Sequence, residues 1–148
     1  MMETKNLGPW QIECDPKLTR SLYVANAVEP STPCTCSACR NFRALGSGAF
    51  PPSARAMLLD LGIDPAVPAE IYENGPNQAG SLSCAGFFHF VGRVLVDDRE
   101  AFATGEAGFR YFIRRDSQLV PQAFANHPIL QFEFEVLLPW VLPEALLQ

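Results

Sequence analysis

Residues 84–96 restrict the fold of this chain more than any other segment, because almost every position there is apolar, aromatic or β-branched. Side chains of a strand alternate between its two faces, so Phe88 and Phe90 share one face while Phe87 and Val91 share the other. Both faces are then apolar, and both need a cover. The segment is therefore predicted to be a central strand with packed layers on each side.

A second strand is predicted over residues 131–138, where apolar and polar positions alternate. Phe132 and Phe134 would point inward, and Glu133 and Glu135 would point to solvent. Further β-prone runs indicate shorter strands at residues 11–14, 21–28, 69–73 and 108–114. The Asn74-Gly75-Pro76 sequence is typical of a turn that closes the strand before it.

Two short helices are predicted between residues 37 and 62. In the first, Ser37 can serve as the N-cap and Gly46 stands at the position of a C-terminal glycine. The second begins at Pro52, and its apolar residues recur at helical spacing until Gly62. A brief helical turn is also expected to start at Asp97 or Asp98 and to run to residue 105.

These elements predict an α+β fold with a mainly antiparallel sheet of about five or six strands and two short helices inserted near residues 37–62. Strands that follow one another without intervening helices after residue 69 favour antiparallel pairing over βαβ units. We expect residues 1–148 to form a single domain, since a chain of 148 residues is long enough for one core.

Charge and hydropathy exclude some functional classes. The chain has a net charge of −5 and no run of lysine or arginine, which argues against a nucleic-acid-binding surface. No segment approaches the roughly 18 apolar residues of a membrane span, and the first residues lack an apolar signal segment. We therefore expect a cytosolic protein without a membrane partner, whose acidic surface suits a basic protein partner.

Three cysteines within six residues, Cys34, Cys36 and Cys39, form the densest group of reactive side chains in the chain. Pro30 and Pro33 place Cys34 and Cys36 in a loop, and Cys39 follows in the first turn of the predicted helix. Three sulfurs at this spacing can reach one zinc ion. A closed structural zinc site needs a fourth ligand, for which the candidates are Cys84, His89 and Cys14.

The same cysteines permit two other interpretations. Cys36 and Cys39 form a C-x-x-C pair at a helix N-terminus, where the helix dipole and nearby arginines favour a thiolate and hence thiol-disulfide exchange. Alternatively, the cysteines have no special role, and the chain is an interaction domain without a cofactor. An odd total of five cysteines fits a reducing compartment better than a disulfide framework.

His89 is a weaker candidate than the cysteines, because it lies between two phenylalanines on the predicted central strand. A histidine so placed is more often a core residue that is hydrogen-bonded to the backbone than a ligand or a base.

The sequence CTCSACRNF at residues 34–42, LGID at 61–64 and FFHFVG at 87–92 resembles a group of small uncharacterised bacterial proteins with the same three patterns. The resemblance covers residues 34–96. It implies a bacterial source, and it favours a site shared by the cysteines and His89. No activity is assigned to such proteins, so the resemblance assigns no catalytic residue.

We therefore expect a non-enzymatic, cytosolic α+β domain with a structural zinc site formed by Cys34, Cys36 and Cys39 together with Cys84, His89 or Cys14. The domain would act as a protein-binding module. The alternative functions are a thiol-disulfide oxidoreductase that uses Cys36 and Cys39, and an interaction domain with no cofactor.

Overall fold

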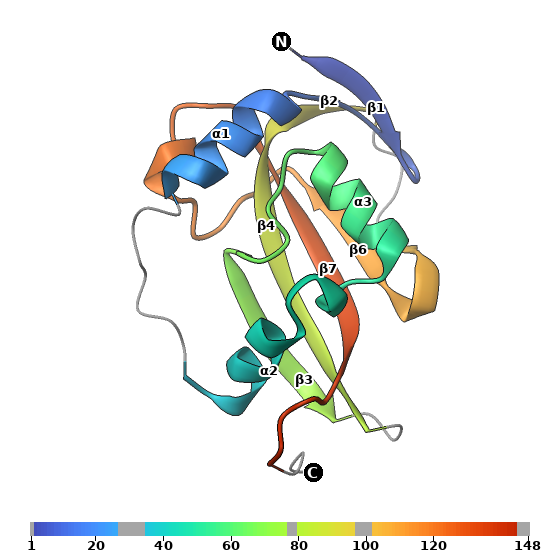
Figure 1. Ribbon diagram of the computed structural model, residues 1–148. Coiled ribbons are helices and arrows are strands. Elements are labelled where there is room, and N and C mark those ends of the chain that lie inside the picture. Colours follow the sequence, from blue (N-terminus) through green and yellow to red (C-terminus); the bar gives the residue numbers. More distant parts are fainter. Residues whose placement is uncertain (1, 27–34, 77–79, 97–101, 145–148) are drawn as a thin grey trace.

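The computed structural model describes residues 2–26, 35–76, 80–96 and 102–144. Within these residues, seven strands form one antiparallel sheet with the order β1-β2-β4-β7-β6-β5, and β3 also pairs with β4 (Figure 1). The strands are β1 (Glu3–Leu7), β2 (Trp10–Cys14), β3 (Glu70–Pro76), β4 (Ser81–Val96), β5 (Ala103–Thr104), β6 (Arg110–Arg114) and β7 (Ile129–Pro139). This arrangement confirms the predicted α+β class and antiparallel sheet.

The helices of the described residues lie mostly in the first half of the chain, and α2 and α3 lie over one face of the sheet (Figure 1). The α-helices are α1 (Pro16–Asn26), α2 (Ser37–Leu45) and α3 (Pro52–Asp60), and the 3₁₀ helices are η1 (Gly46–Ala49), η2 (Glu106–Gly108) and η3 (Gln122–Phe124). Both helices predicted between residues 37 and 62 are confirmed, as α2 and α3.

The sheet is built around the pairing of β4 with β7, which runs in continuous register from Ser81 opposite Pro139 to Val91 opposite Ile129. Even-numbered residues of both strands lie on the face beneath α3, so that Phe88 stands directly opposite Phe132. Phe88 and Phe132 are fully buried, as the alternating pattern of both strands predicts. The predicted central position is therefore confirmed, and so is the two-sided cover for residues 84–92, whereas residues 93–96 are largely exposed.

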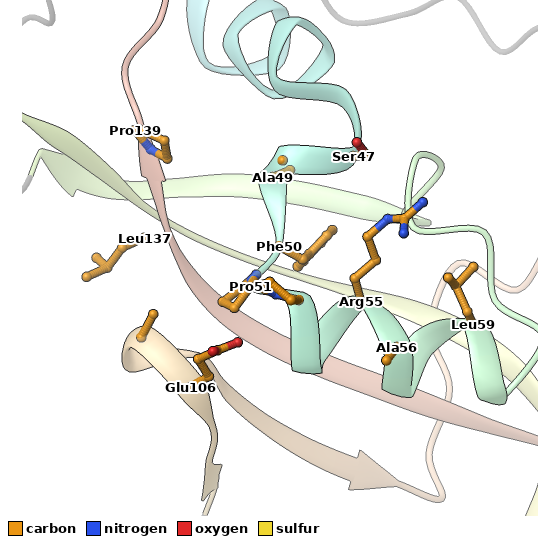
Figure 2. A pocket seen from close by; sticks show the side chains of 13 residues that line it. Ser47, Ala49, Phe50, Pro51, Arg55, Ala56, Leu59, Glu106, Leu137 and Pro139 are labelled. Carbon is orange, nitrogen blue, oxygen red and sulfur yellow. The ribbon is translucent and has the colours of Figure 1, made fainter.

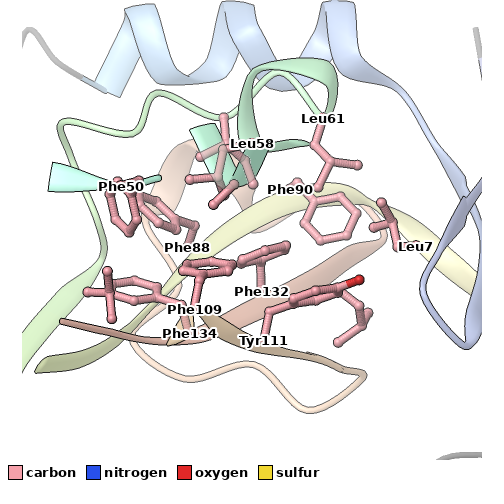
Figure 3. Close-up of a cluster of buried hydrophobic side chains, with 14 of the residues drawn as sticks. Leu7, Phe50, Leu58, Leu61, Phe88, Phe90, Phe109, Tyr111, Phe132 and Phe134 are labelled. Atoms are coloured by element: carbon pink, nitrogen blue, oxygen red, sulfur yellow. The ribbon is translucent and has the colours of Figure 1, made fainter. Parts of the chain in front are cut away.

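Aromatic rings fill the space between this face and the helices (Figure 3). Phe50, which joins η1 to α3, packs its ring against Phe88 at 5.9 Å and against Phe134 at 5.2 Å between ring centroids. Gly86 makes room for this packing, because a Cβ atom there would lie 2.8 Å from the ring of Phe134. Leu58 and Leu61 close the core from the side of α3.

Helix α1 docks against an open stretch of the edge of β4. Strand β3 pairs with β4 only as far as Phe87, and β2 pairs with the same edge only from Gly92 onward. Between these two pairings, at residues 88–91 of β4, side chains of α1 take over. The Thr19 hydroxyl accepts a hydrogen bond from the backbone N–H of Val91 at 3.0 Å, and the Tyr23 hydroxyl donates to the carbonyl of His89 at 2.7 Å. Side chains of α1 therefore satisfy backbone groups of β4 that no strand pairs.

The strand predicted at residues 21–28 is wrong, because residues 21–26 belong to helix α1; residues 27 and 28 lie outside the described residues. Asp15 begins this helix by accepting the N–H of Leu18 at 3.0 Å, and Pro16 occupies its first position. Thr19 and Tyr23 then lie one turn apart on the buried side. Packing against β4 overrides the β-propensity of the local sequence.

Three smaller differences concern the ends of elements. Strand β1 was not among the predicted strands, although it pairs with β2 as a hairpin through Gly8, whose φ of 53° suits glycine. Strand β3 continues through Gly75 to Pro76 with a register shift after Glu73, where a closing turn was predicted. Residues 103–104 form β5 rather than a helical turn, because they pair with β6; the predicted cap at residues 97 and 98 lies outside the described residues.

The substitution Thr19→Val tests the docking of α1. Valine fills the same space but leaves the buried N–H of Val91 without an acceptor, so we expect the free energy of unfolding to fall by about 1–3 kcal/mol. Thr19→Ser, which keeps the hydroxyl, should lose less. Urea denaturation of the two variants measures the difference, and equal losses would contradict a role for this hydrogen bond.

Candidate functional site

The candidate site lies at the start of α2, where Cys36 acts as the N-cap residue. Its sulfur accepts a hydrogen bond from the N–H of Cys39 at 3.4 Å, so Cys36 takes the position predicted for Ser37. Cys39 lies in the first turn of α2, as expected, and is half-buried, whereas Cys36 is exposed. Gly46 ends the helix with a φ of 55°, as predicted. Cys34 lies outside the described residues.

Among the predicted fourth ligands, Cys84 lies on the face of the sheet that α2 and α3 cover. It lies on β4 between Glu73 of β3 and Val136 of β7, and its thiol is buried. Burial, together with the nearby charges of Glu73 and Cys36, raises the pKa of the Cys84 thiol to about 12. Helix α2 packs against β3, the strand that pairs with β4 at Cys84, so Cys36 and Cys84 belong to neighbouring parts of the fold although 48 positions in sequence separate them.

Cys14 and His89 lie apart from this pair. Cys14 stands beside Gly92, which is eight residues along β4 from Cys84, or roughly 26 Å at the rise of a strand. His89 is five positions from Cys84, and an odd separation along a strand places their side chains on opposite faces of the sheet. The structure thus does not bring either residue to the cysteines of α2.

His89 is held in the core of the other face. Its Nε2 atom lies 2.8 Å from the carbonyl oxygen of Gln118, and its ring packs against Phe87 and Phe124. Gln118 donates its backbone N–H to the side chain of Gln131, a buried residue of β7 directly opposite His89. This geometry is that of a structural histidine with a fixed backbone partner.

No three side chains of cysteine, histidine, aspartate or glutamate converge as a metal-binding group within residues 2–26, 35–76, 80–96 and 102–144. Within the described part of the chain, Cys36 and Cys39 lie together at the start of α2, where the Cys39 N–H donates to the Cys36 sulfur, and Cys84 lies on β4 opposite Glu73 of β3.

Helix α2 is fastened to the sheet by the segment that follows β7. Asn41 is fully buried; its amide donates to the carbonyl of Pro139 at 3.1 Å and accepts from the N–H of Val141 at 2.8 Å. Arg40 forms a bidentate ion pair with Glu144, at 2.6 and 3.0 Å, and its Nε donates to the carbonyl of Thr35. The last residue of β7 and the segment after it, residues 139–144, thus form a strap that holds α2 against the sheet.

The strap was not recognised in the sequence, because its partners are about a hundred residues apart. The sequence does contain a local signal for the contact of Asn41. This residue precedes Phe42, and both are buried on α2. A buried asparagine requires hydrogen-bond partners, so its position indicates a contact with backbone from elsewhere in the fold.

Comparison of the chain with protein-family models, with curated proteins and with solved structures gave no match. Among the described residues, no helix combines the length and the apolar character that crossing a membrane requires.

The substitution Asn41→Ala tests whether the strap controls access to Cys84. It removes two buried hydrogen bonds, so we expect α2 to open locally and the alkylation of Cys84 to accelerate by about tenfold. Mass spectrometry of the alkylated native protein reports each thiol separately. Cys14, which is equally buried and far from α2, should react at its original rate; an equal acceleration at Cys14 would indicate global destabilisation instead.

The burial of His89 predicts a dependence of stability on pH. Burial lowers the pKa of His89 below its ordinary value of 6.5 in the folded protein, although the hydrogen bond to Gln118 opposes the shift. The unfolded chain then binds a proton more readily, so the free energy of unfolding falls as the pH drops below about 6.5, by at most about 1.4 kcal/mol per pH unit. Urea denaturation between pH 7.5 and 5.5 should show a steeper loss for the native chain than for His89→Gln, and parallel curves would contradict this.

Proposed function

We propose that the chain is a protein-binding module in which a structural zinc ion ties α2 to the sheet through Cys34, Cys36, Cys39 and Cys84. The observation that carries the proposal is that Cys84 lies on the helix-covered face of β4, where β4 pairs with β3, and that α2 packs against β3. This arrangement adds a sulfur of β4 to the cysteines of α2. Four cysteine sulfurs are a complete set of ligands for a closed structural zinc site.

The chemistry of Cys84 supports zinc in particular. A buried thiol with a pKa raised to about 12 stays protonated at neutral pH and is a poor nucleophile. A bound zinc ion supplies the positive charge that deprotonates a coordinating thiol. Cys84 is therefore better suited to hold a metal than to react. The other proposed fourth ligands are less suitable, because Cys14 lies far from Cys84 along the sheet and His89 points to the opposite face.

The remaining parts of the proposal are the compartment and the partner. Cysteines stay reduced and available to a metal in the cytosol, where we place the chain. The net charge of −5 favours association with a basic protein partner through electrostatic attraction.

Thiol-disulfide exchange by Cys36 and Cys39 is the second candidate function, and one contact favours it. Cys36 is exposed at the N-terminus of α2, and its sulfur accepts the N–H of Cys39. Hydrogen bonding from the first turn of a helix stabilises a thiolate at this position. In this alternative, Cys36 would be the attacking thiol and Cys39 the resolving thiol.

Metal analysis of the protein purified without chelator tests the first proposal. We expect about one zinc ion per chain, and a loss of zinc in Cys84→Ser. Cys14→Ser is the matched control, because Cys14 is also buried with a raised pKa but lies far from α2; it should retain the metal.

A zinc content near zero in the native chain would contradict the zinc site. Thiol titration then separates the remaining alternatives. A reversible Cys36–Cys39 disulfide in equilibrium with glutathione would support the oxidoreductase. Cysteines that react like ordinary thiols would leave an interaction domain without a cofactor.

A further inference from the structure

A second feature of the surface is a groove of about 650 Å³ beside the junction of η1 and α3 (Figure 2). It extends from the end of β7 and η2 to the outer side of α3. Its lining is mainly apolar and includes Phe50, Pro51, Ala56, Leu59, Leu137 and Pro139. Its volume lies within the range of roughly 300–1,000 Å³ that is usual for small-molecule sites.

Two charged side chains line the groove, and only one of them is available to a ligand. Glu106 already accepts the N–H and the hydroxyl of Ser53, at 3.2 and 3.0 Å, at the N-terminus of α3. The negative charge of Glu106 is thereby balanced by the positive end of that helix. Arg55 is exposed, and its guanidinium forms no ion pair with any described residue.

Most residues that line the groove belong to a segment with a positive net charge, although the whole chain is acidic. Residues 16–60, which contain the three α-helices, include five basic and two acidic residues, while the chain has a net charge of −5. The negative charge of the protein is thus concentrated in the remaining segments. At the groove itself, Arg55 is the basic residue of the lining, and its charge attracts an anionic ligand.

We infer that this groove binds a small amphiphilic carboxylate, with the apolar body of the ligand along Pro51 and Leu59 and its carboxylate on Arg55. Apolar contact supplies most of the affinity of such a ligand. A charge-assisted, bidentate pair with a guanidinium fixes its orientation, since the arginine fork matches the two oxygens of a carboxylate. The inference is independent of the cysteine site.

Titration of the ¹⁵N-labelled full chain with decanoate tests this inference by NMR. We expect saturable amide shifts at Ala56, Leu59 and Ala107, which line the groove. Decyltrimethylammonium, which has the same apolar chain and the opposite charge, should bind at least about tenfold more weakly because Arg55 repels it.

Two variants complete the design. Arg55→Gln should weaken decanoate binding by about tenfold, through loss of the charge-assisted pair. Arg43→Gln removes an exposed arginine of α2 that does not line the groove, and it should leave the affinity unchanged.

Three results would overturn the inference. The first is the absence of shifts at these amides with millimolar decanoate, and the second is equal binding of both head groups. The third is a set of shifts that maps instead to the neighbouring groove around Arg20 and Val24.

Discussion

The pairing of β4 with β7 is the interaction on which the rest of the structure depends. Both strands are long, they stay in register over eleven residue pairs, and each places a row of large apolar side chains on the same face. A sheet of this kind cannot stand alone in water, because that face must be covered. Helix α3, η1 and Phe50 cover one side, while residues near His89 and Phe124 cover the other.

The parts of the fold that follow from periodicity were predictable from the sequence. The strands at 84–96 and 131–138 and the helices from Ser37 and Pro52 have clear apolar repeats, and all four are present. Helix α1 was not predictable in this way, because Leu22, Tyr23 and Val24 have strand propensity. Its helical state depends on hydrogen bonds to β4, and such long-range contacts leave no local pattern in the sequence.

The candidate site was likewise predictable from the sequence only in part. The position of the cysteines at the start of a helix was predictable from Cys36, Cys39 and Gly46. The choice among Cys84, Cys14 and His89 was not, since it depends on strand register and on the face that each side chain takes. The placement of α2 against the sheet depends in turn on the strap, which lies more than ninety residues later in the chain.

Helix α1 also has a consequence for the behaviour of the chain at high concentration. The four positions of β4 between the ends of β3 and β2 would otherwise present unpaired peptide groups in the middle of a strongly apolar strand. Such an edge is a template for intermolecular strand addition and aggregation. By occupying it with Thr19 and Tyr23, α1 shields this apolar segment of β4 from a second chain.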